Sequence, residues 1–111
     1  MKVEPTPMED TAKERKETPI YSGVVKYFPR ALEEVARVSH TGNEQHNPGE
    51  PMHWAKEKST DEQDALMRHL TDHAKGELYD TDGSLHLAKV CWRGLSGLER
   101  YLEWKEKQQN Q

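Results

Sequence analysis

The chain has 111 residues, which is enough for one domain, but 32% of them are hydrophobic and another 32% charged. A lone copy therefore has little apolar surface with which to offset the entropy of folding, and we expect both a disordered segment and self-association. A formal net charge of −4 argues against general nucleic-acid binding, no apolar run is long enough to span a membrane, and no secretion signal is visible. The single cysteine, Cys91, excludes an internal disulfide and fits a cytoplasmic protein.

The two ends of the chain are predicted to lack fixed structure. The first 18 residues are mainly Pro, Glu, Lys and Thr with almost no apolar content, which is typical of a disordered tail. Residues 108–111 are expected to fray. The ordered domain is therefore expected over residues 19–107.

A first helix is predicted to begin at Pro29, because proline suits the first helical turn. Its apolar residues recur at helical spacing and are Ala31, Leu32, Val35, Ala36 and Val38. Gly42 is expected to end it. Residues 47–58 are rich in Pro and Gly, and they predict a loop that carries one large aromatic residue, Trp54.

A second helix is predicted to begin near Ser59 and Thr60, which have Glu62 and Gln63 three positions later, as in a capping box. Its expected apolar face is Leu66, Met67, Leu70 and Ala74. Gly76 either ends this helix or interrupts it.

Residues 80–84 predict a turn, and a third helix is predicted over about residues 85–105. The main apolar stripe of this helix is Leu87, Ala88, Cys91, Leu95, Leu98 and Leu102. A second strip consists of Val90, Gly94, Gly97 and Tyr101, so we expect burial on more than one side. Gly94 and Gly97 either permit the close approach of a helix or ligand or are tolerated surface positions. The fold class predicted is all-α, a helical bundle completed by oligomerisation.

Acidic residues stand out on the first helix. Glu33 has Arg30 and Arg37 at spacings of three and four, which favours a surface ion pair. Glu34 borders the apolar stripe, and a carboxylate turned toward a core needs a partner or a metal ion. Glu34 is therefore the stronger functional candidate of the two.

A second acidic pair, Glu77 and Asp80, follows the second helix. If that helix continued past Gly76, Glu77 would share a face with Leu66, Leu70 and His73. Carboxylates from separate helices that face one interior are a common way to build a metal site in a helical bundle. The alternative is a solvated helix end.

Other side chains are candidates for substrate contacts. Trp54 can stack on a base, or it can pack on the core. Positions considered for phosphate contacts are Lys26, Arg30, Lys56 and Arg68, and His73 is considered a further substrate contact.

In their order, these motifs resemble the phage MazG-like dATP/dGTP diphosphohydrolases. The residues that carry the resemblance are Ala31-Leu32-Glu33-Glu34-Val35-Ala36, Gly42-x-Glu44, Trp54-x-Lys56, Arg68-His69, Gly76-Glu77-x-x-Asp80 and Gly83-x-x-His86-x-Ala88. They span about residues 26–103.

The resemblance implies an all-α fold assembled as a homo-oligomer, a dimer or a tetramer. It implies hydrolysis of dGTP or dATP to the monophosphate and pyrophosphate with Mg²⁺ or Mn²⁺, in control of a phage nucleotide pool. Glu34, Glu77 and Asp80 match its catalytic metal-binding carboxylates, Glu33 matches the first Glu of the usual pair, and Glu44 is a further metal ligand candidate. The chain departs from the broader pattern where Arg37 and Val38 replace another Glu.

Two rival interpretations remain open. One is a non-enzymatic helical adaptor that binds through the apolar third helix. The other is a zinc or HD-type phosphohydrolase that uses His69, Asp72 and His73, because histidines four apart on a helix can hold zinc.

Overall fold

The computed structural model describes residues 7–110 of the chain, with side chains from residue 11 onward. The chain divides into two compact units, Met1–Leu32 and Glu33–Gln111. Its described elements are helical apart from one isolated bridge between Tyr79 and Leu85, which confirms the all-α prediction.

The first unit contains α1 (Pro7–Glu17) and a π-helical turn, η1 (Tyr21–Val25). The structure differs here from the disordered tail that we predicted, because good helix formers, Lys, Glu, Arg and Ala, dominate α1. Residues 1–6 of that predicted tail lie outside the described residues.

Helix α2 spans Pro29–His46, and its predicted start at Pro29 is confirmed. The predicted end at Gly42 is wrong. Gly42 keeps a negative φ, and the next residue, Asn43, is buried with side-chain partners in the following loop. The backbone leaves the helix only at Asn47, and the loop after it ends in a short 3₁₀ turn, η2 (Lys56–Lys58).

Helix α3 spans Glu62–Ala74 and ends at Gly76, whose φ of 90° suits glycine. Glu77 N–H bonds to the Asp72 carbonyl and Gly76 N–H to the His73 carbonyl, which together form a Schellman motif. The helix therefore does not continue to Glu77. The predicted capping box is also absent, since the Ser59 hydroxyl donates to the Glu62 side chain and accepts no backbone N–H at the start of the helix.

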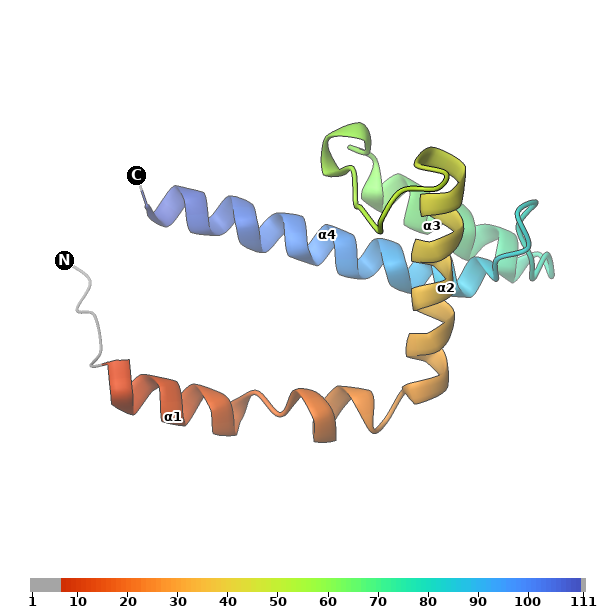
Figure 1. The fold of residues 1–111 in the computed structure, drawn as a ribbon. Helices are drawn as coiled ribbons and strands as arrows, with labels where there is room; N and C mark the ends of the chain where they lie inside the picture. The colour runs from red at the N-terminus through yellow and green to blue at the C-terminus, as the bar shows by residue number, and fades with distance from the viewer. Residues whose placement is uncertain (1–6, 111) are drawn as a thin grey trace. The chain divides into compact units, whose positions relative to one another are not determined.

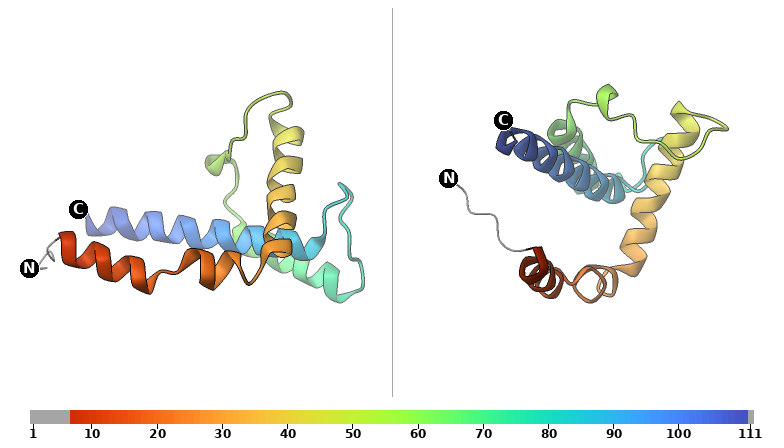
Figure 2. Two further views of the ribbon diagram at one scale, coloured as in Figure 1. Left: turned by 60° about the horizontal axis from the view of Figure 1, so that its bottom comes forward. Right: turned by 60° about the vertical axis from the view of Figure 1, so that its left-hand side comes forward.

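Helix α4 spans His86–Gln109 and packs against α3 (Figures 1 and 2). It extends beyond the predicted end, so residues 108 and 109 are helical, while Gln111 lies outside the described residues. The turn predicted over residues 80–84 precedes it.

The side of α4 that faces α3 is polar, contrary to the prediction. Along it lie His86, Lys89, Arg93, Ser96, Arg100 and Glu103, each with a partner from α3 or the neighbouring loops. The predicted apolar stripe is largely exposed within one chain, and Leu98 is 56% accessible. Among residues with described side chains, the buried apolar ones are Ala65 and Ala88.

The predicted apolar face of α3 is only partly correct, because Leu66 lies near Gly94 of α4 but the other predicted residues are exposed. Met67 and Leu70 are exposed, whereas Glu62 and Ala65 are buried against α4. Gly94 and Gly97 lie near α3, but an added Cβ would meet its nearest atoms at 3.9 Å, which is ordinary contact. Helix α3 does approach these glycines, yet the fold does not require them.

Candidate functional site

A cavity of about 420 Å³ opens in the unit that begins at Glu33. Its walls come from the second half of α2, the loop before α3, and one face of α4. Trp54 and Trp92 form part of the wall with their rings edge to face, 5.6 Å between centroids. Trp92 Nε1 donates to Ser39 Oγ at 2.7 Å, which fixes the indole orientation. A volume in this range suits a small organic ligand.

Asn43 holds the loop wall of this cavity in place. Its side chain is buried, and its Nδ2 donates to the Glu50 carbonyl at 3.0 Å. Its Oδ1 accepts from His53 N–H at 3.1 Å and from Asn47 Nδ2 at 3.3 Å. One α2 side chain thus fixes three positions of the loop over residues 47–53.

Three cationic side chains, Lys58, Lys89 and Arg93, line the same cavity. Arg93 is oriented by Glu62, whose Oε2 accepts from Arg93 Nη1 at 3.0 Å and also from Ser96 Oγ. Burial alone would raise the pKa of Glu62, but hydrogen bonds from Ser96, Arg93 and Ser59 outweigh it and lower the pKa. Glu62 is therefore a buried, charged anchor for Arg93.

Lys89 lies between two carboxylates of the turn that precedes α4. Its Nζ is 2.6 Å from Asp80 Oδ2 and 2.7 Å from Asp82 Oδ2. Burial would raise the pKa of Asp82, but hydrogen bonds from Lys89 and the Ser84 amide, with the Lys89 charge, lower it to about 2. The hydrogen bond from Lys89 likewise lowers the pKa of Asp80. All three groups are charged at neutral pH.

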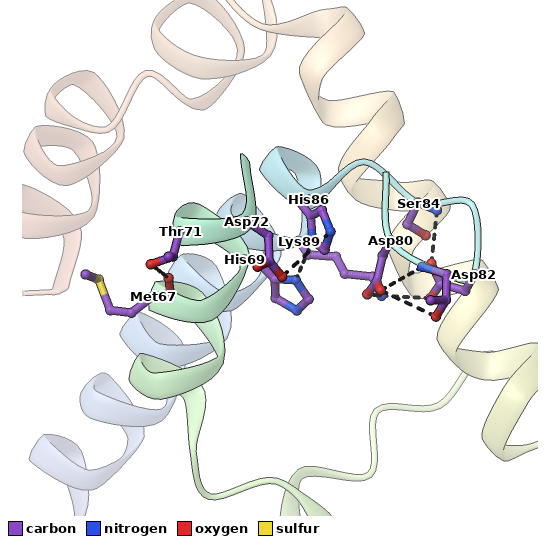
Figure 3. A network of polar contacts seen from close by, with 10 residues as sticks. Met67, His69, Thr71, Asp72, Asp80, Asp82, Ser84, His86 and Lys89 are labelled. Carbon is purple, nitrogen blue, oxygen red and sulfur yellow. Dashed lines mark hydrogen bonds and ion pairs between the residues drawn. The ribbon is translucent and has the colours of Figure 1, made fainter. Parts of the chain in front are cut away.

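A histidine pair lies next to this turn (Figure 3). His69 Nδ1 and His86 Nδ1 face each other at 2.9 Å, and His86 Nε2 is 3.9 Å from Asp72 Oδ2. Burial lowers the pKa of His69, and the charge of Lys89 adds to this effect. Within the described residues, donor atoms gather in two groups that could hold a metal ion: His69, Asp80 and His86, and Asp72, Glu77 and His86.

The predicted carboxylates are only partly brought together. Glu77 and Asp80 each belong to a group centred on His86. Glu34 lies elsewhere, where it lines a smaller cavity of about 120 Å³ with Asp82 and pairs with Arg37 at 3.4 Å. The predicted pairing of Arg37 with Glu33 is thus wrong, because Glu34 is also on the same helix face, three residues before Arg37.

Glu33 and Glu44 are both exposed on α2. Neither belongs to a donor group in the described part of the chain.

Only some of the predicted substrate contacts lie at the large cavity. Trp54 lines the large cavity, whereas Lys56 pairs with Glu103 at 2.8 Å and lies 4.9 Å from the centre of the Trp54 ring. Arg68 pairs with Asp61 at 3.2 Å, and His73 is half-buried in the last turn of α3. Lys26 and Arg30 belong to the first unit and are exposed.

No site role was predicted for Asn43, Asp82, His86, Lys89 or Arg93, although His86 is part of one motif that carries the family resemblance. A signal for three of them was available, since His86, Lys89 and Arg93 recur at spacings of three and four and define one helix face. The donor groups do not support the HD-type interpretation. His69 and Asp72 each share a group with His86, and neither group contains His73.

Comparison with protein families gives one finding. A family model described as dATP/dGTP diphosphohydrolase, N-terminal, matches residues 8–110. Comparisons with curated proteins and with solved structures give no match. In the described part of the chain, no helix combines the length and apolar character needed to cross a membrane.

Proposed function

We propose, from the premise that the chain belongs to the dATP/dGTP diphosphohydrolase N-terminal family, that it hydrolyses dGTP or dATP to the monophosphate and pyrophosphate. The observation that carries the proposal is the family match over nearly the whole chain. By the resemblance of its motifs, we also propose that the reaction serves control of a phage nucleotide pool.

The large cavity supports this proposal as the place for the nucleoside. Aromatic rings stack favourably on a purine, and Trp54 and Trp92 supply two of them at the wall. Asn43 holds the loop that completes the wall. The cavity therefore offers a preformed apolar surface next to cationic groups.

The cations of the cavity suit the triphosphate. Arg93 has a fixed orientation through Glu62, so its remaining N–H donors can bind phosphate oxygens without losing further side-chain freedom. Lys89 and Lys58 add positive charge beside it. These groups would stabilise the negative charge that moves to the leaving pyrophosphate.

The carboxylates of the turn partly fit the divalent cation that such chemistry uses. Glu77 and Asp80 are each close to His86, so oxygen ligands are present, but Glu34 is not among them. A bound divalent cation supplies charge neutralisation at the phosphates and lowers the pKa of a water ligand. We propose Mg²⁺ or Mn²⁺ as this cation.

The reaction balances with water as the nucleophile. The water oxygen bonds to the α-phosphorus, and the bond from that phosphorus to the bridging oxygen of the β-phosphate breaks. The bridging oxygen leaves with pyrophosphate, and the proton lost by water passes to a carboxylate base and then to solvent. We propose Asp80 as this base, because it pairs with Lys89, a cation of the cavity, at 2.6 Å. Asp82 is 2.7 Å from Lys89 and lines the cavity itself.

The test is a pyrophosphate assay with each deoxynucleoside triphosphate in the presence of Mg²⁺ or Mn²⁺. We expect product from dGTP or dATP and a fall in kcat of about 10²- to 10⁴-fold in Asp80→Asn. Glu99→Gln, an exposed carboxylate of α4, is the matched control. Release of pyrophosphate that Asp80→Asn and Glu77→Gln leave unchanged would refute the assigned site.

The exposed apolar stripe of α4 is the observation that favours the adaptor interpretation. A thermal-shift measurement separates the two, because dGTP with Mn²⁺ should stabilise an enzyme by mass action and should leave an adaptor unchanged.

We further propose that the chain forms a homo-oligomer, a dimer or a tetramer, in which a second copy covers this stripe. Leu87, Leu95, Leu98 and Leu102 are all exposed along one side of α4. The molar mass in solution tests this directly, and a monomer at micromolar concentration would contradict it.

A further inference from the structure

The imidazole of His86 is almost fully buried and has different surroundings at its two nitrogens. Its side chain is 5% exposed. Asp72 Oδ2 lies 3.9 Å from Nε2, and His69 Nδ1 lies 2.9 Å from Nδ1. Asp72 favours the proton on Nε2 through its charge, since 3.9 Å is too long for a hydrogen bond. In that tautomer Nδ1 of His86 accepts the N–H of His69.

The two Nδ1 atoms share this hydrogen bond, and a metal ion that displaces its proton would find two imidazole nitrogens close together. Two ligands about 2.0–2.1 Å from one ion are about 2.9 Å apart at a right angle and about 3.3 Å apart in the tetrahedral arrangement of Zn²⁺. The 2.9 Å between the two Nδ1 atoms is within about 0.5 Å of both values. A carboxylate oxygen of Asp80 completes the group, with all three donor atoms within 4.8 Å of one another.

We infer that His69, His86 and Asp80 form a binding site for a transition-metal dication of the class of Zn²⁺, Co²⁺ or Mn²⁺, with Asp72 orienting His86 (Figure 3). Two imidazoles and one carboxylate suit these ions, whereas Mg²⁺ takes oxygen ligands. The inference names the cation class at Asp80. It rests on the proposed function only for the catalytic use of that cation.

Lys89 leaves room for this occupancy. Its ammonium contacts Asp80 and also Asp82, so it can release Asp80 and still keep one carboxylate partner. The charge of the incoming ion replaces that of Lys89 at Asp80. No charge in this group of side chains is then buried without an opposite charge beside it.

The experiment uses the full chain after dialysis against a chelator. Co²⁺ is titrated in while its visible absorption is recorded, and Zn²⁺, Mn²⁺ and Mg²⁺ are titrated by calorimetry. We expect one Co²⁺ or one Zn²⁺ to bind per chain and Mg²⁺ to bind much more weakly. Nitrogen ligands should change the absorption spectrum of the bound Co²⁺.

His69→Gln and Asp80→Asn should each weaken Zn²⁺ binding at least tenfold, and Asp72→Asn about 10- to 100-fold. His40→Gln, an exposed histidine of α2, is the control and should bind as the unmodified chain does. His69 is chosen in place of the buried His86 so that the variant keeps its helical circular dichroism.

A Co²⁺ spectrum that the chain does not alter, or that persists in His69→Gln, overturns the inference. Either result leaves the pyrophosphate assay with Mg²⁺ as a separate test of the hydrolase proposal. Conversely, a chain that binds Co²⁺ through His69 but releases no pyrophosphate supports the metal site and contradicts the hydrolase.

Discussion

Lys89 compensates the negative charge of two carboxylates at the site. It bonds to Asp80 and Asp82 within the same turn, and its side chain is mostly buried. Without it, two nearby carboxylates would repel each other in a poorly solvated position.

Replacing Lys89 with Met should therefore change the titration of its partners. The pKa of Asp82, about 2 in the folded chain, should rise toward its ordinary value, because burial is then opposed mainly by the hydrogen bonds from the Ser84 amide and hydroxyl. Carbon-detected NMR of the carboxyl groups measures this pKa. An Asp82 pKa that stays near 2 in Lys89→Met would contradict the assigned ion pair.

Glycine positions give opposite predictions according to their backbone. Gly97 is helical with room for a Cβ, so Gly97→Ala should raise the free energy of unfolding by about 0.4–1 kcal/mol. Gly76 has a φ of 90°, so Gly76→Ala should lower it by about 1 kcal/mol or more. Urea denaturation of both variants is the measurement, and a destabilised Gly97→Ala would mean that α3 lies closer than described.

Helices α3 and α4 are joined mainly through polar groups. Glu62 is 3% exposed and binds Arg93, Ser96 and Ser59. Such a buried pair costs solvation when formed, but removing one partner leaves the other without compensation.

Glu62→Ala should therefore lower the free energy of unfolding by about 3 kcal/mol, at the lower end for a broken buried pair, because Arg93 is partly exposed. Glu99→Ala should change it by less than about 0.5 kcal/mol. Chemical denaturation checks both values. Equal effects in the two variants would show that the Glu62 network does not join the helices.

The same carboxylate predicts a pH dependence of stability. Since its folded pKa lies below the ordinary value of 4.5, the Glu62 contribution is fully present above pH 4.5 and is lost as the pH falls through the folded pKa. When the pH is lowered from above 4.5 to below it, the urea midpoint should fall more for the unmodified chain than for Glu62→Gln. Parallel midpoints would contradict a lowered Glu62 pKa.

Helices α2, α3 and α4 could be predicted, because hydrophobic spacing and Pro29 are local signals. Helix α1 could not, because almost no apolar residues mark it. The side that each helix buries could not. In α4 the apolar residues predicted a core face, but the polar residues from His86 to Glu103 have partners far away in sequence on α3 and the loop. Likewise, Asp80 was found from its spacing to Glu77, whereas its neighbours His69 and Lys89 depend on how the chain turns at Gly76.

At the scale of the molecule, a single chain leaves the apolar side of α4 in contact with water. Apart from the two buried alanines, the apolar residues with described side chains are at least partly accessible. This surface is costly for a monomer and is typical of a protein that buries it between copies.

Leu98→Glu should accordingly lower the molar mass in solution, because it places a charge in the middle of that surface. The circular dichroism of the helices should be retained. Glu106→Lys, a charge change at an exposed position of the same helix, is the control for light scattering at matched concentrations. An oligomer that survives Leu98→Glu must use another surface.

The alignment of polar groups along α4 also bears on how this sequence can vary in length. His86, Lys89, Arg93, Ser96 and Arg100 reach their partners from one side of a single continuous helix. One inserted residue would rotate everything after it by about 100° and separate several of these pairs at once. An insertion within α4 should therefore not be tolerated and should abolish function. An insertion at the exposed tip of the loop near Gly49 should be tolerated.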